Sequence, residues 1–562
     1  MEMFTLKDVI FQYPDGKNNA LNSLSLTIEE GEFVAVCGPS GCGKTTFLRL
    51  LKREIAPYGS LSGEILYRGK PLYEWEEQRL IEEIGFIFQD PEMQIIMEDV
   101  FQEIVFGMEN LGLSSLEMRK RTAELVHTFG YEHLLHKKAS ELSGGQKQIL
   151  NLLSVLLLKP KVLLLDEPTS QFDPIMAKDL LLLLERLNKE LGMTIVIVEH
   201  RLEDLFNRAD RMIMMDEGKI VYDGRSREVI HSVFQHNDHC FMPYLPSLSL
   251  FYLETEKSPD TNNIPLSVKE CRKWLSSKRY DFSILDKNKE EQGLKRVENL
   301  VVQLEEVYFQ YEKDQPMTLR HLSLHINEGD FFGIVGGNGS GKTTLLKVCL
   351  GILKPQRGKV KVFGQKYSKK TSEDLYKKIA YLPQNPVAYF VHDTIEKELI
   401  EIGKKHNKEN IRERANELLE EFGIGHIRGR HPNDCSGGEI QKAALACLLM
   451  EEPEILFMDE PTKGLDPISK NRLASILGRL HQNGLTIVIV THDIEFAAKH
   501  LSKCAIMFDG SIAAVGTPEH LFKGNYFYTT MISRATQNNI IPEALTLEEA
   551  LQLWEKSKVL SF

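Results

Sequence analysis

The sequence predicts an α/β protein that contains two tandem copies of one domain, each with a parallel-sheet core, an antiparallel β subdomain and a helical subdomain. The first observation is a glycine-rich turn between an apolar strand and a helix, found at residues 38–46 and again at 336–344. The second is the order around these turns, because a β-rich stretch precedes each one and a segment with helical periodicity follows it. The third is that acidic and histidine landmarks recur in the second half in the same order and at nearly constant spacing. Together these observations indicate an internal duplication.

The bulk composition is that of an ordinary globular protein. The 562 residues are 42% hydrophobic and 26% charged, which suits roughly three or four domains with sizeable cores. The formal net charge of −12 provides no basic field for nucleic acid or an anionic membrane surface. No apolar run approaches the ~20 residues needed to cross a bilayer, and the N-terminus does not have the pattern of a signal peptide. The eight cysteines are scattered, as expected for reduced thiols in the cytosol.

The two glycine-rich turns, called glycine loops below, predict phosphate binding. Glycines let the backbone wrap closely enough for several amide hydrogens to point at one polyphosphate. Lys44 and Lys342 can then reach the terminal phosphates, and the Thr45 and Thr343 hydroxyls can bind a magnesium ion. We therefore expect nucleotide to bind at two places. The predicted cofactor-binding loops are Gly38, Pro39, Ser40, Gly41, Cys42, Gly43, Lys44, Thr45 and Thr46, and Gly336, Gly337, Asn338, Gly339, Ser340, Gly341, Lys342, Thr343 and Thr344.

Each half also contains a strand of four apolar residues that ends in an acidic pair. Such a run predicts a strand buried on both faces of a parallel sheet, and α/β sheets hold ligands at the carboxyl ends of such strands. The first carboxylate, Asp166 or Asp459, suits the water shell of Mg²⁺. The second, Glu167 or Glu460, is placed to polarise an attacking water.

The neighbouring predicted strands also end in polar residues. The buried strand that follows the acidic pair ends in His200 in the first half and His492 in the second, which predicts contact with the terminal phosphate. An earlier strand ends in Gln89 or Gln384.

Two further recurring features have both a functional and a structural interpretation. A Ser-Gly-Gly at a helix start presents a hydroxyl, bare amides and the positive end of the helix dipole, so its recurrence favours an anion site over a simple N-cap. An aromatic residue, Tyr13 or Tyr311, precedes each glycine loop. It is either a platform for an adenine ring or an edge-strand side chain packed on its own sheet, and the spacing favours neither. The Ser-Gly-Gly turns are Ser143, Gly144, Gly145 and Gln146, and Ser436, Gly437, Gly438 and Glu439.

The repeat predicts four segments. We expect a first nucleotide-binding domain over 1–227, a connector over 228–298, a second nucleotide-binding domain over 299–530 and a C-terminal helical tail over 531–562. The connector contains several prolines and one short helix candidate, Val268 to Leu275, and no recognisable chemistry. In the tail, Thr546-Leu547-Glu548-Glu549 predicts the capped start of a helix.

The complete set of motifs resembles the ATP-binding cassette (ABC) ATPases over nearly all of both halves. The Walker A, Q-loop, signature, Walker B, D-loop and switch histidine of that family correspond to the features above, in the same order. The resemblance implies tandem P-loop ABC domains that hydrolyse ATP with Mg²⁺ and pair head to tail within the chain. Each ATP would lie between the Walker A of one half and the signature of the other. The catalytic residues that it implies are Glu167, Glu460, His200, His492, Gln89 and Gln384, and the metal-binding residues are Thr45, Gln89, Asp166, Thr343, Gln384 and Asp459.

Two positions depart from the family pattern. Cys435 stands where the signature usually has leucine. The first D-loop reads Ser170-Gln171-Phe172-Asp173, which is unusual, beside Lys463-Gly464-Leu465-Asp466 in the second half. Both halves keep a glutamate and a histidine, so we expect two catalytic sites, and the departures concern whether they turn over equally.

Within the family, the segments after the two Q-loop glutamines resemble the energy-coupling factor type, which are cobalt- and vitamin-importer ATPases. The matching segments are Gln89-Asp90-Pro91-Glu92-Met93-Gln94, and Gln384-Asn385-Pro386 followed by His392-Asp393-Thr394-Ile395. The resemblance implies a peripheral motor at the cytoplasmic face of the cell membrane. It would drive uptake of a vitamin, a vitamin precursor or a metal ion through integral membrane subunits, a T component and a substrate-binding S component.

The alternative is a ribosome-associated fused ABC protein that acts in translation. The proteins of that group join their domains by a charged helical hairpin and typically carry Thr-Asn-His-Leu-Asp after Walker B. This chain has Thr169-Ser170-Gln171-Phe172-Asp173 and Thr462-Lys463-Gly464-Leu465-Asp466 instead. Its net acidity also disfavours RNA, so no nucleic-acid partner is expected.

Overall fold

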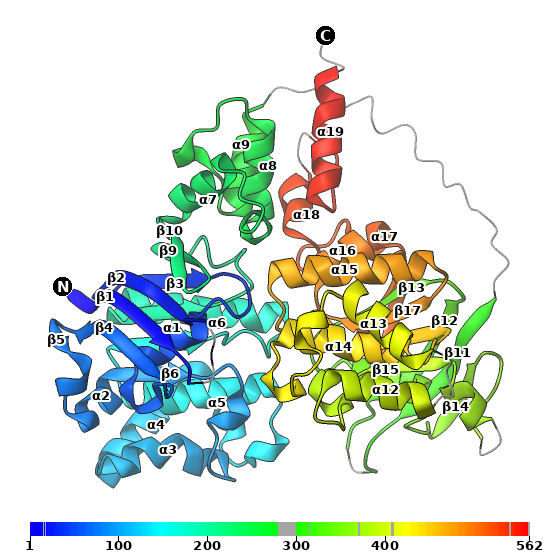
Figure 1. The fold of residues 1–562 in the computed structure, drawn as a ribbon, viewed down its shortest axis with the longest axis horizontal. Coiled ribbons are helices and arrows are strands. Elements are labelled where there is room, and N and C mark those ends of the chain that lie inside the picture. Colours follow the sequence, from blue (N-terminus) through cyan, green and yellow to red (C-terminus); the bar gives the residue numbers. More distant parts are fainter. Residues whose placement is uncertain are drawn as a thin grey trace. The chain divides into compact units, whose positions relative to one another are not determined.

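The computed structural model describes residues 1–14, 16, 18–278, 299–313, 315–368, 371–405, 410–538 and 541–559. The chain divides into two compact units, Met1–Ser249 with Pro259–Leu266, and Leu250–Ser258 with Ser267–Phe562. Each unit contains a six-stranded, mainly parallel sheet and a smaller antiparallel sheet (Figure 1). The predicted α/β architecture with two tandem copies is therefore confirmed.

The larger sheet of the first unit has the strand order β10-β9-β3-β8-β7-β6. β10 pairs antiparallel with β9, and the other neighbours pair in parallel. β3, β6, β7 and β8 are buried at every residue, as expected for strands covered on both faces. The strands are β3 (Phe33–Cys37), β6 (Ile84–Ile87), β7 (Val162–Asp166), β8 (Thr194–Val198), β9 (Arg211–Asp216) and β10 (Lys219–Gly224).

The smaller sheet of the first unit is antiparallel and has the order β2-β1-β4-β5. Its strands are β1 (Glu2–Gln12), β2 (Leu21–Glu29), β4 (Ser60–Tyr67) and β5 (Lys70–Pro71). The helical subdomain is formed by α3 and α4, which follow β6 in the chain. The helices up to the end of β10 are α1 (Lys44–Leu50), α2 (Glu77–Glu83), α3 (Val100–Asn110), α4 (Ser115–Phe129), α5 (Gly144–Leu156) and α6 (Pro174–Leu191).

The second unit repeats this plan. Its larger sheet has the order β15-β16-β17-β13-β18-β19, and its antiparallel sheet has the order β12-β11-β14. The strands are β11 (Leu300–Phe309), β12 (Leu319–Asn327), β13 (Phe331–Val335), β14 (Arg357–Val362), β15 (Ile379–Leu382), β16 (Ile455–Asp459), β17 (Thr486–Thr491), β18 (Lys503–Phe508) and β19 (Ser511–Gly516). The helices that follow β13 are α10 (Lys342–Cys349), α11 (Ser372–Tyr376), α12 (Ile395–Lys405), α13 (Ile411–Glu421), α14 (Gly437–Leu449), α15 (Pro467–Gln482), α16 (Ile494–His500), α17 (Pro518–Phe522), α18 (Met531–Thr536) and α19 (Leu547–Val559).

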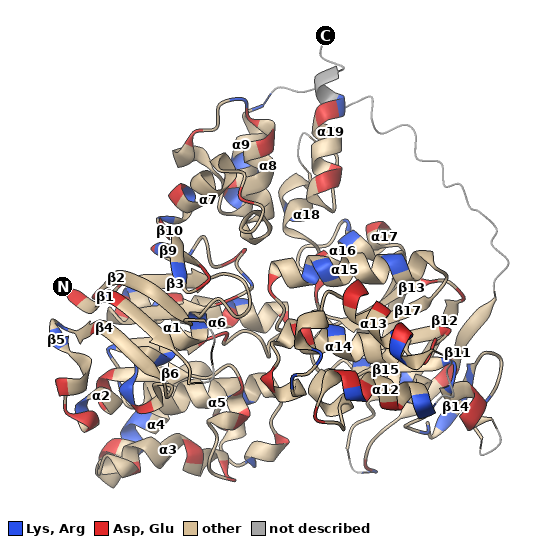
Figure 2. Ribbon diagram, in the orientation of Figure 1, with Lys and Arg blue, Asp and Glu red and all other residues tan. Residues whose placement is uncertain are grey.

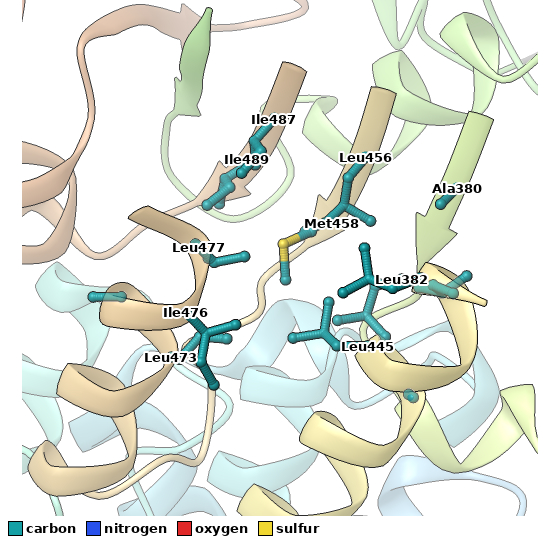
Figure 3. Packing of buried hydrophobic residues seen from close by; sticks show 14 of the residues in the cluster. Ala380, Leu382, Leu445, Leu456, Met458, Leu473, Ile476, Leu477, Ile487 and Ile489 are labelled. Atoms are coloured by element: carbon teal, nitrogen blue, oxygen red, sulfur yellow. The ribbon is translucent and has the colours of Figure 1, made fainter. Parts of the chain in front are cut away.

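The parallel sheet of the second unit is the centre of its core. Side chains from β15, β16 and β17 meet side chains from α14 and α15 in one buried cluster (Figure 3). Leu456 and Met458 of β16 belong to this cluster, whereas Ile455 and Phe457 join the antiparallel sheet in a second cluster. This alternation explains why an apolar run without polar positions forms a strand here, because both faces of the strand are covered.

The connector contains more helix than the sequence predicts. α7 (Ser226–Gln235) and α8 (Ser247–Thr255) precede the predicted helix, which is present as α9 (Val268–Ser276). The prediction of a single helix candidate is therefore wrong. The sequence does not predict α8 because this helix lacks a continuous polar face. Leu248, Phe251 and Leu253 are all buried, and so is Ser249.

In the second unit, the end of the connector packs against the C-terminal tail. The Trp274 ring of α9 stacks on the Trp554 ring of α19 at 5.5 Å between centroids, and the Phe251 ring of α8 meets both edge-on. Arg272 Nε donates a hydrogen bond of 2.8 Å to the Arg534 carbonyl oxygen. The connector is therefore a packed element of the second unit over part of its length.

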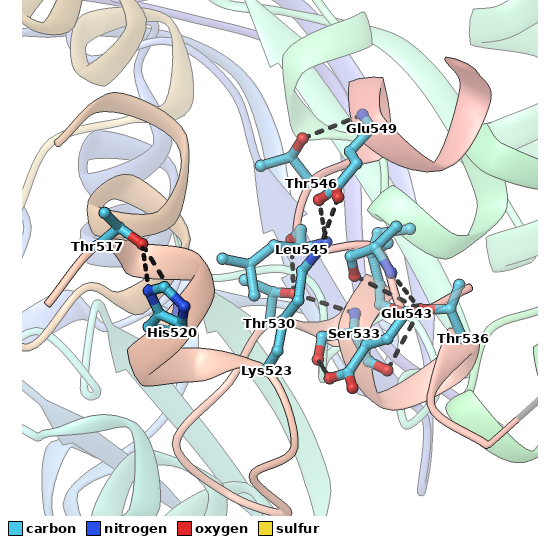
Figure 4. A network of polar contacts seen from close by, with 12 residues as sticks. Thr517, His520, Lys523, Thr530, Ser533, Thr536, Glu543, Leu545, Thr546 and Glu549 are labelled. Atoms are coloured by element: carbon cyan, nitrogen blue, oxygen red, sulfur yellow. Dashed lines mark hydrogen bonds and ion pairs between the residues drawn. The ribbon is translucent and has the colours of Figure 1, made fainter. Parts of the chain in front are cut away.

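A polar network organises the tail itself (Figure 4). Thr530 Oγ1 donates to the Leu545 carbonyl oxygen at 2.7 Å and accepts from Ser533 N at 3.1 Å. Thr546 Oγ1 accepts from Glu549 N at 3.2 Å, and the Glu549 carboxylate accepts from Leu545 N at 2.7 Å. The predicted capped start of the tail helix is confirmed, with the carboxylate binding one residue earlier than a standard capping box.

Lysine, arginine, aspartate and glutamate residues are interspersed along both units (Figure 2). Glu83, at the end of α2, is a buried acidic side chain of the first unit, and it accepts from Lys161 Nζ (2.9 Å), Tyr67 Oη (2.8 Å) and Arg79 Nε (3.1 Å). Burial raises the pKa of Glu83, but these three contacts outweigh burial and hold that pKa at about 2.

Within the described ranges, no helix is long and apolar enough to span a membrane.

Candidate active sites

The glycine loops have the predicted strand-turn-helix geometry in both units. Gly43 adopts a left-handed φ of 103°, and a Cβ there would lie 2.4 Å from the Ala20 carbonyl oxygen, so the position requires glycine. Lys44 begins α1, and its Nζ donates to two loop carbonyl oxygens at 2.8 Å each. Lys342 makes the same two contacts at 3.0 and 2.9 Å. The loops thus hold both lysines over their own backbone, at the start of a helix where anions bind.

Hard oxygen ligands meet beside each loop. Thr45 Oγ1 donates to Asp166 Oδ1 at 3.1 Å, and Thr343 Oγ1 donates to Asp459 Oδ1 at the same distance. Burial, together with the charge of Glu167, raises the pKa of Asp166 to about 6. Burial raises the pKa of Asp459 to about 6 as well. Hydroxyl and carboxylate oxygens are the protein ligands that Mg²⁺ prefers, so these residues fit that ion.

The predicted residues of the first unit converge on Glu167. His200 Nε2 lies 2.9 Å from Glu167 Oε1, and Gln89 Nε2 donates to Glu167 Oε2 at 2.7 Å. His200 Nδ1 is buried and has no hydrogen-bond partner among the residues described. Glu167 has a φ of 45°, a left-handed conformation that is strained for a residue with a Cβ and that is concentrated at functional sites.

The second unit arranges the equivalent residues differently. His492 contacts Glu460 through Nδ1 at 2.8 Å, and His492 N donates to Glu460 Oε2 at 3.3 Å. Lys342 Nζ lies 3.8 Å from Glu460 Oε1. Burial acts to raise the pKa of Glu460, but His492 and Lys342 together hold it below its usual range. Gln384 is exposed, and in the described part of the chain its side chain makes no hydrogen bond to Glu460, unlike Gln89.

Both Ser-Gly-Gly turns serve as helix caps. Ser143 is the N-cap of α5 and Ser436 is the N-cap of α14, each in a reciprocal capping box with the residue three positions later. The Glu439 carboxylate of the second box also lies 2.9 Å from His426 Nε2. Where the chain is described, no hydrogen bond joins either turn to the glycine loop of its own unit. The structural interpretation of the turns is thus observed, and their role as anion sites stays a prediction.

The two tyrosines occupy equivalent positions. The hydroxyl of Tyr13 lies 3.1 Å from Thr46 Oγ1, and that of Tyr311 lies 3.1 Å from Thr344 Oγ1. Each ring packs edge-on against a phenylalanine of the strand that precedes it, yet Tyr13 is 39% and Tyr311 is 52% exposed. The rings therefore pack on their own sheet and also present a surface beside the glycine loop. Adenine stacking stays a prediction.

Sequence reasoning missed two residues that flank His200. Glu199 is buried at the end of β8, and Arg201 reaches the segment that follows Glu167. The available signal was the difference between Glu199-His200-Arg201 and Thr491-His492-Asp493 in otherwise matching strands. A charged residue that ends a fully apolar strand needs a partner, and that requirement singles out Glu199.

The fold and the two sets of residues define a class of protein. Each unit combines a glycine loop at a helix start, a buried aspartate beside the loop threonine, and a glutamate in contact with a histidine. These are the parts of a P-loop nucleoside-triphosphate hydrolase, and the chain contains two copies.

Comparison with known proteins identifies the family. The family model described as ABC transporter matches residues 21–170 and 319–463. The chain is 42% identical to a Bacillus cereus protein named "Putative ABC transporter ATP-binding protein", over 97% of each chain. The chain therefore belongs to the ABC transporter family, binds ATP and is an ATP hydrolase.

Two further similarities extend the comparison. The chain is 30% identical to the "Putative HMP/thiamine import ATP-binding protein YkoD" of Bacillus subtilis, over 93% of this chain and 92% of that protein. A solved structure of the archaeal ribosome recycling factor aABCE1, in complex with ribosomal stalk protein aP1, matches with a TM-score of 0.57 and 20% identity. That match covers 91% of this chain and 90% of the other, and it shows the fold alone.

Proposed function

We propose that this chain is the ATP-hydrolysing motor of an energy-coupling factor-type importer. It drives uptake of a vitamin, a vitamin precursor or a metal ion through separate integral membrane subunits, a T component and a substrate-binding S component. The observation that carries the proposal is the similarity to the HMP/thiamine import protein, which extends over 93% of this chain and 92% of that protein. The chain works at the cytoplasmic face of the membrane as a peripheral subunit.

In this proposal the two halves form two composite ATP sites. Each ATP lies between the glycine loop of one half and the signature serine and glycines of the other. Glu167 and Glu460 act as general bases on the attacking water, and His200 and His492 contact the terminal phosphate. Mg²⁺, when bound, neutralises charge on the phosphates. The residues that would hold it are Thr45, Gln89 and Asp166 in the first half and Thr343, Gln384 and Asp459 in the second.

Exposed apolar side chains after the Q-loop glutamines support a membrane partner. Met93 is 76% exposed, Ile96 is 69% exposed and Phe101 is 47% exposed, all within the segment that leads into α3 or its first turn. In the second unit Val391, seven residues after Gln384, is 83% exposed. Clustered apolar side chains on a folded surface mark sites where another protein binds. We assign this surface to helices of the T component.

The test is a pull-down from detergent-solubilised native membranes in the presence of ATP. The bait is the tagged Glu167→Gln/Glu460→Gln variant, which is expected to bind ATP without hydrolysing it. A bait that also carries Met93→Glu and Ile96→Glu is the matched control for the proposed surface. Recovery of a small set of integral membrane proteins by the first bait and not by the second is expected. Recovery of ribosomal proteins without a membrane subunit would refute the proposal and favour the translation factor.

A further inference from the structure

The first half holds its glutamate–histidine pair through an additional buried carboxylate. Glu199 is 2% exposed, and its Oε1 accepts from Thr169 N at 2.8 Å while its Oε2 accepts from His200 N at 3.1 Å. Thr169 follows Glu167 by two residues in the chain. One side chain therefore joins the backbone just after Glu167 to the backbone that carries His200.

Arg201 holds the other end of the same segment. Its Nη1 donates to the Phe172 carbonyl oxygen at 2.9 Å, so residues 169–172 are bound at both ends. The Phe172 ring packs against the start of α5, where a Cβ on Gly145 would lie 3.0 Å from the ring. The segment is thus fixed between the catalytic pair on one side and the signature turn of its own unit on the other.

The second half has different residues at both positions. Thr491 replaces the carboxylate, and its Oγ1 accepts from Asp493 N at 3.0 Å. Asp493, at the position of Arg201, binds Lys470 Nζ of α15 at 2.8 Å. The amide of His492 is bound instead by the catalytic carboxylate, at Glu460 Oε2. Glu460 therefore accepts the hydrogen bond that Glu199 accepts in the first half.

We infer that Glu199 and Arg201 are positioning residues for the Glu167–His200 pair, and that hydrolysis by the first half depends on them. Glu199→Thr leaves the buried Thr169 N–H without its acceptor, and a buried unpaired donor forces a local shift of the backbone. A displacement of about 1 Å near the reacting groups lowers a rate by about a hundredfold. The inference rests on the proposed catalytic roles of Glu167 and Glu460.

The test uses the full chain with Glu460→Gln as the background, so that turnover reports on Glu167, and repeats the measurement in the wild-type background. Glu199→Thr and Arg201→Asp introduce the residues that the other half carries at these positions. In the Glu460→Gln background each is expected to lower kcat by about 10- to 100-fold and to leave KM for ATP within about twofold, whereas in the wild-type background the second site should keep part of the turnover. Glu199→Gln keeps an oxygen that can accept from Thr169 N, so it should retain more activity than Glu199→Thr. Thr491→Ala in the Glu167→Gln background is the matched control and should change kcat by less than about threefold.

Two results would overturn the inference. One is an unchanged kcat for Glu199→Thr. The other is a lower kcat accompanied by a lower Tm and weaker ATP binding, without recovery in Glu199→Gln, because that pattern reports a structural role alone. Continued ATP hydrolysis by the Glu167→Gln/Glu460→Gln double variant is a different result, because it would refute the proposed catalytic roles of the two glutamates themselves.

Discussion

Packing of the connector on the C-terminal tail predicts a large loss of stability for Trp554→Ala. Trp554 is 2% exposed and contacts the Trp274 and Phe251 rings. Truncating a buried tryptophan to alanine typically destabilises a fold by about 3 to 5 kcal/mol, since contacts are lost and a cavity remains. The stacked pair accounts for about 1 kcal/mol of that. We therefore expect the free energy of unfolding of this region to fall by about 4 kcal/mol in Trp554→Ala. Trp554→Phe should lower it by only part of that amount.

The assay is urea unfolding followed by tryptophan emission. The chain has three tryptophans, so Trp75→Phe is included in every variant and Trp274 becomes the probe in Trp554→Ala. Tyr526→Ala is the matched control, because Tyr526 lies in the same unit and is 74% exposed, and its change should stay within about 0.5 kcal/mol. A shift below about 1 kcal/mol for Trp554→Ala, or one equal to that of Tyr526→Ala, would refute the view that this stack holds the connector on the tail.

Three further predictions concern the sites and the first unit. Glu167→Gln/Glu460→Gln should lower ATP turnover by about 10²- to 10⁴-fold and preserve ATP binding, measured by phosphate release and by nucleotide retention; retained turnover would contradict the general-base assignment. Lys44→Ala should weaken binding about 10- to 100-fold at one site, since one charged hydrogen-bond donor is lost, and a two-site titration that loses both sites would contradict this. Glu83→Gln should destabilise the first unit by about 3 kcal/mol at pH 7. Because the pKa of Glu83 falls from 4.5 unfolded to about 2 folded, the difference from wild type should shrink as pH falls from 4.5 toward 2 in thermal unfolding. A difference that does not depend on pH would contradict it.

The sequence predicts the fold well because its strongest signals are local. Four-residue apolar runs that end in acidic pairs become β7 and β16, and glycine loops become turns that only glycine fits, as at Gly43. The duplication supplies a second test of each signal, since chance motifs do not recur in the same order. Gln89 and His200 contact Glu167, and Asp166 contacts Thr45. These contacts follow from the parallel strands, because the carboxyl ends of parallel strands share one edge of the sheet.

Other features depend on packing that no local pattern encodes. α8 is mostly buried and lacks the continuous polar face by which a helix is recognised in a sequence. The Trp274–Trp554 stack joins residues from the connector and the tail, far apart in the chain. Which histidine nitrogen meets the glutamate, Nε2 of His200 or Nδ1 of His492, depends on side-chain rotamers, although both halves have a glutamate and a histidine at these positions.

The motif residues that the two halves share do not predict how fast each half hydrolyses ATP. Glu167 receives one side-chain donor at each oxygen, from His200 and Gln89, while Glu199 accepts the histidine amide. Glu460 accepts that amide itself and receives His492 Nδ1 on the same oxygen. The two carboxylates thus accept their hydrogen bonds from different donors and on different oxygens, so intact motifs in both halves predict two competent sites without predicting equal ones. The position one before the histidine, Glu199 in the first half and Thr491 in the second, differs between the two sites and lies outside every motif by which the chain is recognised.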